Sequence, residues 1–348
     1  MYFKQIDSFR FFAVLLVLIS HWLHEVPYVE ILRFGAFGVE FFFVLSGFLI
    51  SLQLYRYKDL IDQKKEKIGN ALYVFYIRRI IRILPLYYFV VLIATLLHKG
   101  EIRDAFLWNL SCVSNFYFIK IKYWTSTFSH FWSLSVEEHF YLFWPLLVFI
   151  FKRRFLPIAF VLIICWAVLF RYNSFTHTIE YFRVYAHTIS CLDLFIMGAI
   201  LAYLYHYYKS IFHKISQSRL VKIFTLVGFV VLYYFWIAHT EFQTFNWVFQ
   251  RLFMGVIYLL IIGIVVNGIK GKVGEVLENK ALVKLGKLSY GIYLIHNFVP
   301  GILLPIKKLQ LHFSVEFVIY FIVTIIFSEI LYRFIEVPFR KLNKRFVL

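Results

Sequence analysis

Long apolar stretches separated by short charged segments recur along the whole chain, and this pattern limits the folds that are open to it. The sequence has 348 residues, of which 61% are hydrophobic and only 16% are charged. A soluble domain carries roughly 25% charged residues. Because about 20 consecutive apolar residues cross a bilayer as a helix, we expect an all-α fold: a polytopic transmembrane helical bundle of about ten spans.

The expected spans are each long enough to cross about 30 Å of hydrocarbon. They are residues 9–25, 35–54, 76–97, 132–151, 155–170, 186–207, 222–240, 247–268, 285–304 and 314–335. The segment 105–119 is also apolar, but counting it alone as a further span would place the basic residues 152–154 outside the cell. We therefore predict that this segment is re-entrant or lies on the outer surface.

Basic residues are distributed unevenly between alternate segments of this bundle. Of the 37 Lys and Arg residues, 25 lie on one predicted side and nine on the other. The positive-inside rule then places both termini in the cytoplasm. Because these residues orient spans and face anionic lipids, we expect membrane lipids as partners and no nucleic acid. We expect a single multi-pass membrane domain over residues 1–348, with no appended soluble domain.

The three cysteines have no metal-ligand spacing, so we expect neither a disulfide framework nor a metal site. The candidate functional groups are instead ionisable side chains inside the spans. Inserting each such side chain into a membrane costs about 2.5–3.5 kcal/mol, so each one calls for a functional explanation. Six of them lie in the outer halves of five spans: His21, Glu40, Glu137, Glu138, Asp193 and His296. We predict that they share one polar cavity that opens outward. The alternative is a scatter of structural residues near the interface.

Two features of this set follow from helical geometry. Arg10 and His21 are eleven residues apart, which is close to three turns, so they share a face and lie about 16 Å apart along the axis. The alternative role for His21 is that of a hydrogen-bonded structural residue. Glu137 and Glu138 are adjacent in sequence, so we expect one to line the cavity and the other to pair with a neighbouring helix.

Three arginines lie near the start of the span at 76–97. Arg79 and Arg82 share a helix face, and planar guanidinium groups bind phosphate oxygens well. The alternative is simple anchoring of the cytoplasmic end of the span. The use of Arg at all three positions, Arg78 included, and the kink expected at Pro85 favour a binding role.

Ser46 and Gly47 lie in the middle of the second expected span. Small residues let helices approach closely, so packing is the first interpretation of this pair. The other interpretation is a backbone segment that lies against a ligand.

The motifs that contain these residues resemble the acyltransferase-3 family of membrane O-acyltransferases, which acylate bacterial surface glycans. The resemblance runs from Ile6 to Arg340. Its elements are the pair Arg10 and His21 and the stretches GVEFFFVLSGFLI, RIIRILP, FWSLSVEEHFYLFWP, LDLFIMGA, SYGIYLIH and FIEVPFRK. The chain departs from the family at Glu40, which is more often Asp, and at Cys191, where many members have Arg.

The resemblance implies that His21 is the catalytic histidine, supported by Arg10, and that Arg79 and Arg82 bind acyl-CoA. We expect Glu137 to orient His21 or to bind sugar hydroxyls. The remaining candidates are assigned to two sites. Arg78, Ser46 and Gly47 are assigned to the acyl-CoA site, and Glu40, Trp132, Glu138, Asp193 and His296 to the acceptor site.

We expect from the resemblance an enzyme of the bacterial plasma membrane that transfers an acyl group, most often acetyl, from cytoplasmic acyl-CoA. Acyl-CoA is a co-substrate, and no permanently bound cofactor is expected. The acceptor is a hydroxyl of a cell-surface or lipid-linked glycan, reached directly or through an acyl-histidine relay. The alternative is a transporter or flippase, which typically shows internal repeats and broken helices in corresponding halves; the sequence shows neither.

Overall fold

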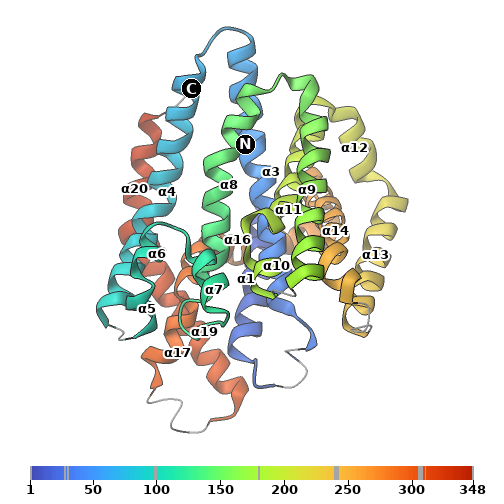
Figure 1. Cartoon of the computed structure of the whole chain (residues 1–348). Helices are drawn as coiled ribbons and strands as arrows, with labels where there is room; N and C mark the ends of the chain where they lie inside the picture. The colour runs from blue at the N-terminus through green and yellow to red at the C-terminus, as the bar shows by residue number, and fades with distance from the viewer. Residues whose placement is uncertain are drawn as a thin grey trace.

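The computed structural model is a bundle of α-helices, most of which run along one long axis (Figure 1). It describes residues 2–26, 29, 31–97, 100–178, 181–238, 243–304, 309 and 311–346. The longer helices are α1 (Lys4–Trp22), α3 (Phe34–Asp62), α4 (Ile68–Leu97), α8 (Phe131–Ile150), α9 (Leu156–Thr178), α11 (Thr188–Tyr207), α13 (Arg219–Ala238), α14 (Gln250–Asn267), α16 (Lys280–Ile295) and α19 (Phe313–Leu331).

Shorter elements connect these helices. They are α5 (Glu101–Asp104), α6 (Phe106–Leu110), α7 (Ser114–Ile121), η1 (Arg153–Phe155), α10 (Tyr181–Ala186), α12 (Lys209–Gln217), η2 (Phe245–Phe249), α15 (Gly271–Leu277), η3 (His296–Phe298), α17 (Val299–Ile302), η4 (Tyr332–Glu336), α20 (Val337–Leu342) and η5 (Asn343–Arg345). Two of them, η2 and η4, are single turns of π-helix that continue directly into α14 and α20.

Eight segments among the described residues are long and apolar enough to cross a membrane. They are Lys4–Trp22, Phe34–Asp62, Ile68–Leu97, Arg153–Thr176, Tyr181–Tyr207, Arg219–Ala238, Phe245–Asn267 and Phe313–Leu342. They correspond to eight of the ten predicted spans. The other two predictions fall on α8, which carries two glutamates near its middle, and on α16, which has 16 residues and continues into η3 and α17.

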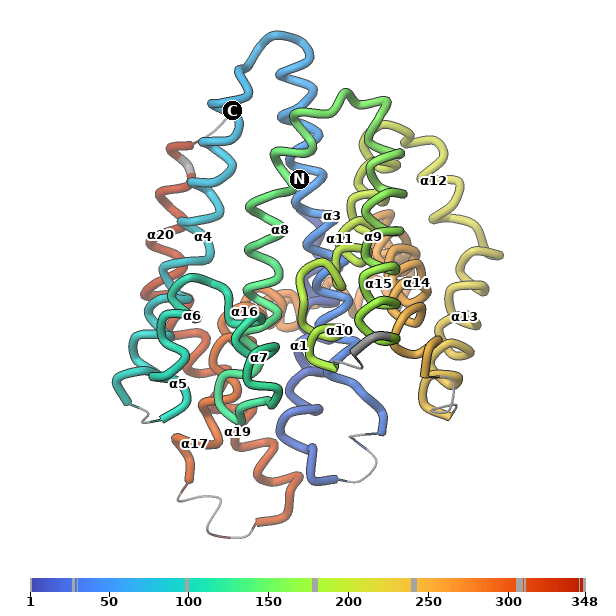
Figure 2. Tube along the Cα trace, viewed as in Figure 1, coloured from blue at the N-terminus to red at the C-terminus, as the bar shows by residue number. Residues whose placement is uncertain are grey.

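The apolar segment 105–119 forms the short helices α6 and α7, as expected for a segment that is not a span. An eight-residue helix such as α7 is only about 12 Å long. Buried polar contacts fix it to the bundle: the backbone N–H of Ser114 donates to Ser135 Oγ at 3.0 Å, and Asn115 Nδ2 donates to the Ala186 carbonyl at 3.2 Å. The helices α5, α6 and α7 lie at the end of the bundle opposite to the N- and C-termini (Figures 1 and 2).

Helix α3 lies at the centre, between α1 and α11. In its most apolar window 72% of the residues are buried, against 11% in α13, whose apolar side chains face outward as those of a lipid-facing helix do. Glycines permit the closest approaches. A Cβ added to Gly47 would overlap the carbonyl oxygen of Phe195 on α11, and one added to Gly286 on α16 would overlap that of Asp7 on α1. The contact at Gly286 fixes the height of α1, which carries Arg10 and His21, relative to α16.

Candidate active site

The last turn of α1 brings His21 against a histidine and an asparagine from η3. His21 Nδ1 lies 2.7 Å from His296 Nε2 and 2.9 Å from Asn297 Oδ1, and the two imidazole rings stack with their centroids 4.9 Å apart. Asn297 Nδ2 also donates to Nδ1 of a third histidine, His130, at 3.1 Å. We call His21, His130, His296 and Asn297 the histidine cluster.

The partners of the cluster assign the protons on its rings. His296 Nδ1 lies 2.6 Å from the Tyr293 carbonyl oxygen, which only accepts, so Nδ1 carries the proton and Nε2 is an acceptor. The Nδ1 of His21 is therefore the donor to His296 and Asn297. It follows that His21 Nε2 is unprotonated in the neutral ring, and no described residue hydrogen-bonds to it. This nitrogen is free to accept a proton.

An arginine-rich cavity of about 110 Å³ lies toward the N-terminal end of α1. Its charged lining residues are Arg10, Arg79, Arg82, Arg340, Glu137 and Glu138. Among the described residues Arg82 has no hydrogen-bond or ion-pair partner, and the Nε atoms of Arg79 and Arg340 are buried without one. With four arginines against two glutamates and unused donors, this arginine cavity is suited to an anion.

A second cavity, of about 500 Å³, adjoins the arginine cavity. Its walls include Arg10, Leu49, Arg82 and Arg340, which line the arginine cavity as well. Lys287 adds a further positive charge. We call this second space the vestibule, because it continues the arginine cavity toward the chain termini.

A third and larger cavity, of about 620 Å³, lies at the other end of α1. We call it the aromatic cavity, because Tyr181, Tyr185, Trp236 and Trp247 line it. Its polar lining residues are Ser20, Arg33, Glu40, Asn246, Gln250 and Arg251. On α1, Ser20 of this cavity lies about 15 Å above Arg10 of the arginine cavity, by the rise of an α-helix.

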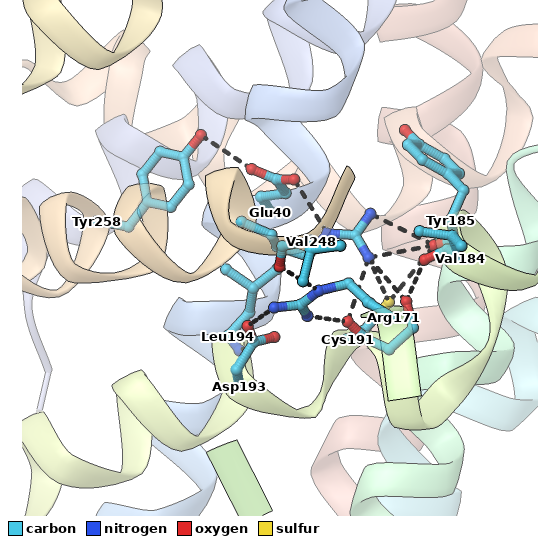
Figure 3. A network of polar contacts seen from close by, with 11 residues as sticks. Glu40, Arg171, Val184, Tyr185, Cys191, Asp193, Leu194, Val248 and Tyr258 are labelled. Atoms are coloured by element: carbon cyan, nitrogen blue, oxygen red, sulfur yellow. Dashed lines mark hydrogen bonds and ion pairs between the residues drawn. The ribbon is translucent and has the colours of Figure 1, made fainter. Parts of the chain in front are cut away.

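The floor of the aromatic cavity is a network of buried charges. Arg251 Nε lies 3.2 Å from Glu40 Oε1, and Arg171 Nη2 lies 2.6 Å from Asp193 Oδ2 with neither side chain exposed. Figure 3 shows Glu40, Arg171, Asp193 and Tyr258 in this one network, which joins helices that are distant in sequence. Each acid is matched by an arginine, as buried charges require.

The histidine cluster has neighbours in the lining of both the arginine cavity and the aromatic cavity. On one side, Tyr293 lines the arginine cavity, and its ring lies 5.5 Å from His296 and 5.6 Å from His130. On the other side, Ser20, the neighbour of His21, lines the aromatic cavity. Each cavity is thus lined by at least one residue that adjoins the cluster, Tyr293 for the arginine cavity and Ser20 for the aromatic cavity.

The prediction of one shared polar cavity is wrong. The six ionisable groups divide among the histidine cluster (His21, His296), the arginine cavity (Glu137, Glu138), the aromatic cavity (Glu40) and the buried pair of Asp193 with Arg171. The sequence predicts the depth of a residue along its helix, but not the direction in which its side chain points. The expectation for the adjacent glutamates is also wrong, because both line the arginine cavity.

Glu137 does not contact His21. Its carboxylate accepts hydrogen bonds from Ser46 Oγ at 3.1 Å and from the Tyr141 hydroxyl at 2.8 Å. The groups that orient His21 are His296 and Asn297. Arg10 and His21 share a helix, but Arg10 lies in the arginine cavity and pairs with Asp7 at 3.5 Å.

Three further candidates lie outside the cavities described above. Gly47 packs against α11, although Ser46 beside it lines the arginine cavity. Arg78 donates to the Tyr57 hydroxyl at 3.2 Å. Trp132 is buried against Phe43 and Tyr185, so it supports the wall of the aromatic cavity from behind.

Sequence reasoning missed His130, Asn297, Arg33 and Arg340. A signal was present for two of them, because His130 immediately precedes the FWSLSVEE stretch and Asn297 immediately follows His296. The roles of His130 and Asn297 depend on a contact between residues that are 167 positions apart in the sequence. Hydrophobic periodicity does not predict such contacts.

The acyltransferase-domain profile of the acyltransferase-3 family matches residues 3–333 of the chain. The chain belongs to the acyltransferase-3 family. The resemblance that the sequence motifs indicate is thus confirmed.

Relatives of this acyltransferase-3 chain carry related names. O-acetyltransferase OatA of Staphylococcus aureus strain NCTC 8325 / PS 47 is 31% identical over 371 residues, which cover 98% of the chain and 57% of that protein. A protein of Staphylococcus aureus strain COL, provisionally named an O-acetyltransferase, is 32% identical over 370 residues. The match covers 98% of the chain and 58% of that protein. The chain thus spans less than two thirds of the relatives it matches. No solved structure matches it.

Proposed function

We propose that this acyltransferase moves an acyl group, with acetyl as the first candidate, from cytoplasmic acyl-CoA to a hydroxyl of a cell-surface or lipid-linked glycan. The observation that carries the proposal is the histidine cluster at the last turn of α1, with the aromatic cavity beside that turn and the arginine cavity toward the start of the helix. The name of the relative OatA, an O-acetyltransferase, supports both the acetyl group and the hydroxyl acceptor.

The donor end is supported by the charge of the arginine cavity. Arg82 and the Nε atoms of Arg79 and Arg340 supply unused donors, and guanidinium groups bind phosphate oxygens bidentately. In this proposal the phosphates of acyl-CoA lie in the vestibule and against these arginines, and the thioester arm extends through the narrow arginine cavity toward the cluster. The excess of basic residues on one side, 25 of 37, supports a cytoplasmic position for this end and for both termini.

The proposed chemistry uses His21 Nε2 as a general base. The acceptor hydroxyl oxygen forms a bond to the thioester carbonyl carbon while Nε2 takes the hydroxyl proton. The carbon–sulfur bond then breaks, and the departing CoA sulfur takes that proton back from His21. A positioned base of this kind is worth roughly 10²–10⁴-fold in rate. His296 and Asn297 hold the ring in the tautomer that this step needs.

The proposal requires ten spans, with α8 and α16 added to the eight apolar candidates. Both helices face the arginine cavity, where their polar residues are shielded from lipid. Polar residues in a span are tolerated when they face the interior of the bundle. A flippase would also need an interior cavity, but its transport step does not require a general base. A histidine whose tautomer is fixed by two partners therefore favours the acyltransferase.

The test uses the purified chain in proteoliposomes that contain acetyl-CoA labelled in the acetyl group, with envelope glycan extracted from cells lacking the protein as acceptor. Mass spectrometry of the glycan should show acetyl ester formation by the unmodified protein and none by the His21→Gln variant. Transfer by His21→Gln at the unmodified rate would overturn the role of His21. Movement of glycan without consumption of acetyl-CoA would instead support a flippase.

A further inference from the structure

One positive charge in the aromatic cavity is unmatched. The Arg33 guanidinium lies 5.0 Å from the centroid of the Trp236 ring at the cavity wall, where the side chain is half-buried. It has no hydrogen bond or ion pair with any residue that the structure describes. The other arginine of the wall, Arg251, is paired with Glu40. The described lining residues therefore carry one excess positive charge, which belongs to Arg33.

The backbone of Arg33 is in a conformation that residues other than glycine rarely adopt. Its φ of 48° and ψ of 31° are left-handed, although it flanks the first turn of α3. This region is disfavoured for residues other than Gly and Asn. Backbone outliers of this kind gather at ligand-binding positions, where the surrounding structure holds them. The strained turn places the charged group on the ring of Trp236.

A second donor in the same cavity is also unused. Gln250 is only 4% exposed, it lines the cavity, and its Nε2 has no hydrogen-bond partner. The π-helical turn η2, which precedes Gln250, carries Trp247 on the same wall. π-Helical turns occur frequently at functional sites. A buried amide donor without a partner costs free energy unless a ligand or water satisfies it.

The shape of the cavity suits a sugar. Its volume of about 620 Å³ is within the range of ligand pockets. Tyr181, Tyr185 and Trp247 present broad apolar faces with polar edges, which match the C–H faces and hydroxyl rims of sugar rings. The ring pair of Tyr181 and Tyr185 is stacked, with an interplanar angle of 9°.

We propose that the acceptor is an anionic glycan, and that Arg33 binds its carboxylate or phosphate while the sugar ring lies against the aromatic wall. This inference rests on the proposed function, in which the glycan bound in the aromatic cavity is the acceptor of the acyl group. The guanidinium fork matches the paired oxygens of both anionic groups, and Gln250 supplies a further donor to a sugar oxygen. A glycan held at Arg33 would share the cavity with Ser20, which directly precedes His21 on α1.

The experiment measures binding to the full chain in nanodiscs of zwitterionic phosphatidylcholine, so that the lipids do not compete as anions. The probes are neutral chitotetraose, a hyaluronan tetrasaccharide that carries carboxylates, and N-acetylglucosamine 1-phosphate. The unmodified protein should bind one or both anionic probes at least tenfold more tightly than chitotetraose. Preference for only one of them identifies carboxylate or phosphate as the recognised group.

Arg33→Gln should weaken anionic binding by about ten- to a hundredfold, the range of a charged hydrogen bond, and leave chitotetraose unchanged. Arg33→Lys, which keeps the charge, should retain part of the preference and shows that the position tolerates substitution. Arg103→Gln is the matched control, because it removes an exposed arginine that donates to Thr95 and Leu96 carbonyls away from the cavity. An equal ratio of anionic to neutral binding in the unmodified and Arg33→Gln proteins would overturn the inference.

The same measurement on His21→Gln separates this inference from the proposed function. That variant should lose acyl transfer but keep the preference for anionic probes, because Arg33 is unchanged. If the unmodified protein transferred no acyl group, the proposed function would fail, and the anion preference would still decide the role of Arg33.

Discussion

The side-chain oxygen of Asn297 lies 2.9 Å from Nδ1 of His21, across 276 positions of the sequence. The amide nitrogen of the same side chain donates to His130 at 3.1 Å. Asn297 thus holds one histidine by accepting and another by donating, which an amide side chain can do because its oxygen accepts and its nitrogen donates. In the proposed mechanism Asn297 is a positioning residue that acts through His21.

Asn297→Ala should lower kcat by about ten- to a hundredfold, because a misplaced base loses rate steeply with small displacements. The KM for acyl-CoA should stay unchanged, since Asn297 does not line the arginine cavity. Asn297→Asp keeps the oxygen that accepts from His21 and should restore part of the rate. The measurement is acyl transfer over a range of acyl-CoA concentrations, with the exposed Asn70→Ala as control. Equal loss in the Ala and Asp variants would contradict the positioning role.

His21→Ala and His21→Gln should both abolish transfer while insertion and membrane abundance stay normal. The imidazole contributes a proton acceptor in the proposed step, and neither replacement has one of suitable basicity. The measurement pairs the acyl-transfer assay with immunoblots of membrane fractions. A Gln variant that kept most of the rate would return His21 to a structural role.

Much of the fold was predictable because spans depend on local apolar composition. Eight of the ten predicted stretches match helices long enough to cross a membrane, and the doubtful segment 105–119 forms two short helices. The arginine motif around Arg82 was also visible, because its residues are near one another in sequence. What local composition predicts is the depth of a residue along its helix.

The partners of the buried polar groups could not be predicted in this way. Asp193 looked like a ligand for the acceptor, but Arg171 neutralises it from another helix at 2.6 Å. Glu137 looked like a partner of His21, but it points toward Ser46 on α3. Both outcomes depend on how each helix is rotated about its axis, which contacts between distant segments determine.

The buried pair of Arg171 and Asp193 supports a prediction about stability. Arg171→Leu should lower the free energy of unfolding by about 3–5 kcal/mol, because it leaves a carboxylate buried without a partner. The double variant Arg171→Leu, Asp193→Leu should recover much of this loss, since no charge is then buried. Thermal unfolding in detergent compares these two variants with the single variant Asp193→Leu. Simple additivity of the two single losses would show that the pair is not coupled.

The orientation of the bundle can be tested by cysteine labelling. The background replaces Cys112, Cys165 and Cys191 with Ala, and each test variant adds one cysteine at an exposed position. From outside intact cells, an impermeant maleimide should label Ser126→Cys and Gln243→Cys. It should not label Lys65→Cys, because the basic segment at 55–79 is expected in the cytoplasm. Labelling at position 65 would reverse the orientation and with it the assignment of the donor side.

The last prediction separates binding from anchoring at Arg79 and Arg82. If these arginines only anchor α4, replacing both with Lys keeps the charge and nearly all activity. If they bind phosphates, Lys retains the charge but loses the paired donors of the fork, including the buried Nε of Arg79 that has no protein partner. The double Lys variant should then need about tenfold more acyl-CoA for half-maximal rate, with kcat much less affected.

The control for this variant is Arg154→Lys, which makes the same change in another basic segment, where the guanidinium lies over Phe155 at 4.8 Å. Its dependence on acyl-CoA should match that of the unmodified protein. Rates are measured in reconstituted membranes, with the amount of inserted protein determined for each variant. An unchanged acyl-CoA dependence in the double variant would leave the arginines as anchors. The unused donors of the arginine cavity would then need another anion, which must be sought among lipid headgroups because these also reach the cytoplasmic ends of spans.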